Sequence, residues 1–231
     1  MLVEGNLLSA IFYTESMKLE KYVLSKFDPN RLGDVALFRE FLKENDTPEC
    51  HLLFAEFLYA TGEKLHVKEY AEHVIIAYNG GERDAIPYLA NMYFFGEGIE
   101  KDIGLALVLF EKCGDVGIPD GYFSVGNEYL MGVNVPYDHR KAFHYLKKAS
   151  DGGSAKGMNG LGLMYLCGFY VDKDVRKAKK LFAKARIRGS SSGYSNMMLI
   201  DECGPEFDYK GMMLEHGLIE GYIEGKDALD E

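Results

Sequence analysis

The sequence lacks the marks of a membrane or secreted protein. No stretch reaches the roughly 18 consecutive apolar residues that a membrane helix needs, so no membrane insertion is expected. The first residues, MLVEGNLLSAIFYTE, carry no Lys or Arg ahead of their short apolar stretch, which argues against a secretory signal. We therefore expect a soluble protein of the cytoplasm.

Cysteine is scarce, and its spacing is not that of a metal or redox site. The sequence has four cysteines and no C-x-x-C pair. Cys113 and Cys167 fall where neighbouring repeats carry ordinary packing residues. Buried free thiols are expected at all four positions, which are Cys50, Cys113, Cys167 and Cys203.

Motifs that carry catalysis are absent as well. There is no H-E-x-x-H, no G-x-S-x-G elbow and no phosphate-binding G-x-x-x-x-G-K-[ST] loop. His66 and His73 would lie roughly 10 Å apart along a helix, too far to share a zinc ion without a ligand from a further element. His139 and His144 are expected to face outward, and His51 is a candidate for a binding face. The sequence predicts no enzyme, no cofactor and no metal.

Basic residues are outnumbered: 26 Lys and Arg stand against 36 Asp and Glu, giving a net charge of −10. Such a chain repels phosphate backbones, so no nucleic-acid partner is expected. One basic cluster, residues 176–188, lies along a predicted helix without interleaved aromatic residues. A solvated outer face is the simpler interpretation, and a groove for an acidic peptide is the alternative.

What the sequence does contain is a repeat of 36 residues. Blocks beginning at positions 85, 121, 157 and, more weakly, 193 align without a gap. A period of this length indicates stacked helical pairs, which usually bind other macromolecules. The shared first segment reads Leu89-Ala90-x-x-Tyr93-x-x-Gly96, Val125-Gly126-x-x-Tyr129-x-x-Gly132 and Leu161-Gly162-x-x-Tyr165-x-x-Gly168.

Each repeat predicts two helices and their ends. In the block at 121–156, apolar residues at helical spacing form a first helix that ends at Gly132, and Asp138 is placed to cap a second helix. Asn134 is expected to tolerate a positive φ in the loop. Small residues at fixed places, such as Gly126 and Ala142, allow the paired helices to pack closely, and the repeated tyrosines read as packing residues rather than catalytic ones.

The order L-G-x-x-Y-x-x-G-x-G-V-x-x-D-x-x-K-A-x-x-x-F-x-K-A-x-x-x-G resembles the Sel-one-like repeat family, relatives of the tetratricopeptide repeats, and 161–189 fits it closely. Asn134 and Tyr170 depart from it by replacing a loop glycine. The resemblance implies an all-α, right-handed superhelical solenoid of stacked antiparallel helix pairs. We expect one continuous domain with an N-terminal cap at 1–48, a divergent repeat at 49–84, repeats at 85–120, 121–156 and 157–192, and a degenerate repeat or cap at 193–231.

In such a solenoid the first helices line the concave face, so its partner should contact the positions that the signature leaves free. These candidate partner-binding residues are Pro87, Asn91, Phe95, Phe123, Asn127, Met131, Asn159 and Leu163. The resemblance implies a non-enzymatic scaffold or adaptor that binds a protein or peptide. The alternative is a bacterial immunity protein that occludes a secreted toxin. A β-lactam hydrolase is the third possibility, although this chain lacks the regularly spaced cysteines of such relatives.

Overall fold

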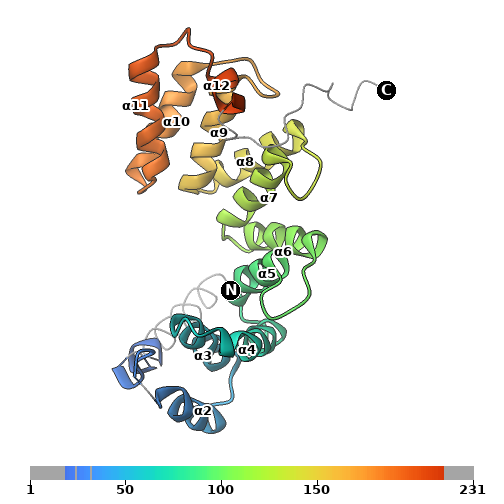
Figure 1. Ribbon diagram of the computed structural model, residues 1–231, viewed down its shortest axis with the longest axis vertical. Helices are drawn as coiled ribbons and strands as arrows, with labels where there is room; N and C mark the ends of the chain where they lie inside the picture. Colours follow the sequence, from blue (N-terminus) through green and yellow to red (C-terminus); the bar gives the residue numbers. More distant parts are fainter. Residues whose placement is uncertain (1–18, 24, 32, 216–231) are drawn as a thin grey trace, which may run out of the picture. The chain divides into compact units, whose positions relative to one another are not determined.

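The computed structural model describes residues 19–23, 25–31 and 33–215, and this part of the chain is helical with no strand (Figure 1). It divides into two compact units, one up to Ala106 and one from Leu107 onward. The predicted caps at 1–48 and 193–231 extend outside the described residues at both ends. The all-α fold of consecutively packed helices is confirmed.

The first unit contains α2 (Asp34–Glu44), α3 (Pro48–Ala60), the short η1 (Lys64–His66), α4 (Val67–Asn79) and α5 (Ala85–Phe95). α3 packs against α4, and α4 packs against α5. Ahead of α3, aromatic rings replace the repeat signature: Phe27 stacks on Phe38 at 4.5 Å between ring centroids, and Phe38 contacts Phe54 at 4.9 Å. The residues before the repeats thus cover the apolar face of α3.

The second unit continues from α6 (Ile103–Asp115), which the boundary between the units crosses. It holds α7 (Asp120–Met131), α8 (His139–Asp151), α9 (Ala155–Cys167), α10 (Val175–Ile187), α11 (Ser191–Cys203) and α12 (Tyr209–Glu215). From α7 to α11 each helix packs on the next, and α7 also contacts α9. The shared core includes Leu146, Met164 and Phe182, all fully buried.

The helix ends follow the signals in the sequence. Asp138 and Asp174 accept hydrogen bonds from the backbone N–H groups of Lys141 and Lys177 at 2.9 and 2.8 Å, which satisfies first-turn donors. The first helices end at Gly96, Gly132 and Gly168, with φ of 76°, 68° and 71°. A second set of left-handed glycines stands between repeats, one period apart, at Gly81, Gly117, Gly153 and Gly189.

Close approach of the helices explains the small residues. A Cβ on Gly162 would lie 2.6 Å from a ring carbon of Phe182, and one on Gly126 would lie 2.9 Å from Leu146. Gly157 of α9 is pressed against Ala149 of α8, where a Cβ would lie 2.5 Å from the Ala149 methyl. Close packing therefore favours glycine at these three places, and the repeat pattern predicts small residues at the place shared by Gly126 and Gly162.

The loop after the first helix departs from the expectation for Asn134. Tyr170, at the position of Gly98, is the one described non-glycine residue with a positive φ, at 62° against 73° for Gly98. Asn134 holds an ordinary φ, and its side-chain amide donates to Glu128 at 2.9 Å. The asparagine thus fixes its loop through its side chain instead of through a left-handed backbone.

Two predictions about single side chains were wrong. His139 is buried rather than outward-facing, because its ring stacks on Phe169 from the following repeat at 4.8 Å between centroids. Cys203 is exposed, whereas Cys50, Cys113 and Cys167 are buried free thiols. Burial raises the pKa of Cys113 to about 11 and that of Cys167 to about 12, so both stay protonated at neutral pH.

Candidate interaction surfaces

On α5 the predicted partner-binding residues recur every four positions and therefore share one face of the helix. Pro87 is half-buried and Asn91 is exposed. Phe95 is 63% exposed, and its ring meets that of Phe94 edge-on at 4.9 Å. α5 also carries no charged residue. This face presents an amide and an aromatic ring to solvent.

In the second unit the corresponding residues are less exposed. Phe123, Met131 and Leu163 are half-buried and pack against the core formed by α7 to α11. Asn159 accepts a hydrogen bond from the side chain of Asn196 at 2.9 Å, which links α9 to α11. Asn127 is half-buried on α7. Four of these five residues, all except Asn127, therefore make contacts within the solenoid.

The signature tyrosines have an additional contact that the sequence pattern did not reveal. The Lys177 ammonium lies over the Tyr165 ring, 4.0 Å from its centroid, and donates to its hydroxyl at 2.7 Å. The Lys141 ammonium lies over the Tyr129 ring, 4.8 Å from its centroid. Because the lysine comes from the second helix of the same repeat, the contact joins the two helices of a pair. Both tyrosines are half-buried, so their rings serve packing and also hold this lysine.

A basic and aromatic depression, called here the α8 hollow, lies along α8 and has a volume of about 830 Å³. It brings together residues from the end of α7, from α8 and from the loop between α9 and α10. Its lining consists of Tyr129, Asp138, Arg140, Lys141, Phe143, His144, Tyr145, Lys147 and Tyr170. Sequence reasoning missed this site because its residues come from two repeats.

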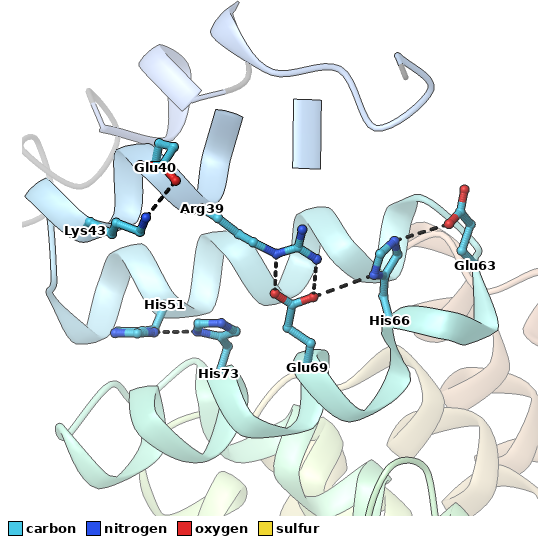
Figure 2. Close-up of polar contacts among 8 residues, drawn as sticks. All are labelled: Arg39, Glu40, Lys43, His51, Glu63, His66, Glu69 and His73. Atoms are coloured by element: carbon cyan, nitrogen blue, oxygen red, sulfur yellow. Dashed lines mark hydrogen bonds and ion pairs between the residues drawn. The ribbon is translucent and has the colours of Figure 1, made fainter. Parts of the chain in front are cut away.

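Polar side chains also cluster in the first unit, where α2, α3 and α4 meet (Figure 2). The Arg39 guanidinium donates two hydrogen bonds to Glu69, at 2.6 and 2.7 Å, and His66 lies 3.6 Å from the same carboxylate. The hydrogen bonds from Arg39 hold the pKa of Glu69 below its usual range. This pair ties α2 to α4.

In the same cluster His51 of α3 faces His73 of α4, with 2.5 Å between their Nδ1 atoms (Figure 2). His51 also contacts Asp46 through Nε2 at 2.7 Å. Since a carboxylate only accepts, His51 donates to Asp46 and a single proton lies between the two Nδ1 atoms. Burial lowers the pKa of His73, and the neighbouring His51 ring lowers it further.

His73 therefore meets His51, not His66. Two imidazoles supply fewer ligands than the three or four protein ligands of ordinary zinc sites. Among the described residues, no group of three or more His, Cys, Asp and Glu side chains is arranged to hold a metal ion. What the pair provides is a hydrogen bond between α3 and α4 that depends on protonation.

The repeat geometry and the capping pattern are matched by a family model. The model described as Sel1 repeat matches residues 84–113, 119–154 and 155–190. The chain contains three repeats of the Sel1 family. This is the family that the sequence resembles, and its repeats commonly form protein-binding scaffolds.

Solved structures show the same solenoid fold. A Sel1 repeat protein from Oxalobacter formigenes is 22% identical, with a TM-score of 0.63 over 74% of this chain and 73% of that one. A protective antigen of uropathogenic Escherichia coli strains with an SLR fold is 17% identical, with a TM-score of 0.55 over 80% of this chain and 48% of its own.

An immunity protein from Pseudomonas aeruginosa is 22% identical, with a TM-score of 0.46 over 71% of this chain and 64% of that one. No curated protein matches the Sel1 repeat chain. In the described part of the chain, no helix combines the length and apolar character that crossing a bilayer requires.

Proposed function

We propose that this Sel1 repeat chain is a non-enzymatic scaffold of the cytoplasm that binds a protein or peptide through its first helices. The observation that carries the proposal is the face of α5, where Phe95 is 63% exposed on an uncharged helix beside an exposed Asn91. An asparagine amide offers both a donor and an acceptor to a peptide backbone, and an aromatic ring is a typical anchor of an interface.

The expected energy follows from the exposed ring. Complete burial of a Phe side chain stabilises by roughly 1.5–3 kcal/mol. Because 63% of Phe95 is available to a partner, its contribution would be about 1–2 kcal/mol. That corresponds to a change of about 5- to 30-fold in Kd.

Pull-down from native lysate, read by mass spectrometry, identifies the partner and tests the proposal. Phe95→Ala should weaken capture by about 5- to 30-fold. Val108→Ala is the matched control, because Val108 is 62% exposed on a second helix, and it should leave capture unchanged. Equal capture by the wild type and by both variants would rule out the α5 face.

The second unit is tested by combining Phe123→Ala with Asn127→Ala. Phe123 packs against the core, so circular dichroism must first show that the variant is folded. A folded double variant that captures the same partner at the same level would exclude α7 from the binding surface.

The nature of the captured partner separates the scaffold from its alternatives. A scaffold should take short peptides, whereas an immunity-type neutraliser should bury roughly 1,500 Å² or more against one folded toxin. Hydrolysis of a chromogenic β-lactam by the purified chain would contradict the non-enzymatic assignment.

A further inference from the structure

The α8 hollow concentrates positive charge in a chain whose net charge is −10. Its lining holds three cations, Arg140, Lys141 and Lys147, and a single carboxylate, Asp138. All three cations are exposed, so a partner can reach them.

Asp138 offsets only one of the three cations, Lys141. One Asp138 oxygen accepts from the backbone N–H of Lys141, and the other lies 3.7 Å from the Lys141 ammonium. Lys147 pairs with Asp151, but both side chains are largely exposed, at 58% and 66%, so water screens that pair. Arg140 has no anionic partner among the described residues. A guanidinium in this position is suited to a bidentate contact with a carboxylate.

Aromatic rings form the rest of the hollow. Tyr129 and Tyr145 are stacked at 6.4 Å between centroids, and Phe143 lies 5.6 Å from Tyr170. Tyr170 is 55% exposed and holds a left-handed backbone, with φ 62°, where Gly98 stands in an earlier repeat. A positive φ costs free energy for a tyrosine, whereas a glycine adopts it without strain. The tyrosine ring therefore lies at the hollow in spite of this backbone cost.

We propose that the α8 hollow binds an acidic segment of a partner protein, with Arg140 contacting a side-chain carboxylate and the Tyr170 and Phe143 rings packing against the neighbouring residue. Short acidic segments fit this site better than nucleic acid, because the net charge of −10 repels a long polyanion while three local cations attract a few carboxylates. The site lies on a second helix, so it goes beyond the first-helix surface of the proposed function.

The test uses the full chain and a fluorescein-labelled peptide, Gly-Glu-Glu-Tyr-Glu-Glu, with a counterpart in which Gln replaces every Glu. Fluorescence anisotropy should show that the acidic peptide binds at least tenfold more tightly than the Gln peptide and that its affinity falls as salt rises. Equal binding of the two peptides would overturn the proposal. Tighter binding of a hexathymidylate than of the acidic peptide would overturn it too, in favour of a nucleic-acid ligand.

Two substitutions locate the binding site. Arg140→Glu should weaken binding of the acidic peptide at least tenfold. Arg176→Glu is the matched control, because Arg176 is the same residue one repeat later, in surroundings that include Asp172, Asp174 and Glu206. Equal losses in both variants would mean that only overall charge matters, and would refute the site.

Tyr170→Gly tests the aromatic wall without endangering the fold, because glycine suits the left-handed conformation. We expect a folded protein with unchanged or higher Tm and a severalfold weaker affinity for the acidic peptide. Unchanged affinity in this variant would remove Tyr170 from the site.

Discussion

Replacing Gly157 by alanine tests the close packing between α8 and α9 directly. The added Cβ would lie 2.5 Å from the Ala149 methyl and 2.9 Å from two backbone atoms, the carbonyl carbon of Ala149 and the nitrogen of Ser150. Backbone atoms in a helix cannot move singly, so the two helices must separate. Ala85, at the same repeat position, is fully buried beside Ala77, so the interface of α4 with α5 is spaced for a methyl group.

The expected size of the effect comes from two opposing contributions. Overpacking a core costs about 1–3 kcal/mol. Alanine in place of glycine favours a helix by up to about 1 kcal/mol. Because the contacts include backbone, the steric cost should prevail and leave a net loss of about 1–2 kcal/mol. For a chain of this size that is a decrease of about 2–8 °C in Tm.

Urea denaturation followed by circular dichroism measures the change. Gly104→Ala is the control, since Gly104 is an exposed helical glycine whose added Cβ would have only an ordinary contact, 3.4 Å from Asp102. That variant should be unchanged or more stable by up to about 1 kcal/mol. Gly193→Ala should lower the free energy of unfolding by less than Gly157→Ala, because the closest contact of its added Cβ would be 2.9 Å. If Gly157→Ala were as stable as Gly104→Ala, the close-packing argument would fail.

Three further predictions concern capping and charge. Asp174→Ala should lower the free energy of unfolding by about 1 kcal/mol in urea denaturation, because a first-turn N–H loses its acceptor. Asp172 is an exposed loop residue, so Asp172→Ala should leave the free energy of unfolding unchanged. The free energy of unfolding should decrease as pH falls below about 6.5, because the pKa of His73 is lowered in the folded protein and the unfolded chain therefore takes up the proton first. His73→Gln should flatten this pH dependence between about pH 7.5 and 5.5. An unaltered slope of unfolding free energy against pH in that variant would contradict the histidine pairing. Glu69→Gln should cost less than about 1 kcal/mol at pH 7, since the Arg39 and Glu69 side chains are 43% and 25% exposed. The lowered pKa of Glu69 makes that contribution present above the ordinary carboxyl pKa and lost as pH falls through the folded value, so variant and wild type should converge in acid.

Much of the fold could be predicted because it is local and repeated. Caps such as Asp138 and stop residues such as Gly132 act within a few positions of the chain, and the period shows which small residues share a place. A 36-residue period also separates scaffold residues from the positions that vary.

The miss at Asn134 depends on a local contact with Glu128, whereas the others depend on contacts between elements. His139 is covered by a ring from the next repeat, and His73 by a histidine from the other helix of its pair. Cys203 occupies the position of the buried Cys167, but in the described part of the chain no further complete repeat stacks beyond it. The α8 hollow needs Tyr170 beside Phe143, which no single repeat contains.

The left-handed glycines between repeats affect how such a chain can gain or lose whole repeats. Gly117 and Gly153, with φ of 91° and 96°, close successive repeats in nearly the same backbone conformation, and each is followed by a helix that presents a glycine to the one before. The 36-residue segment between these two glycines therefore begins and ends in nearly the same backbone conformation. Duplication or removal of 36 residues between them would rejoin matching conformations, so the number of units can vary while each junction keeps its geometry.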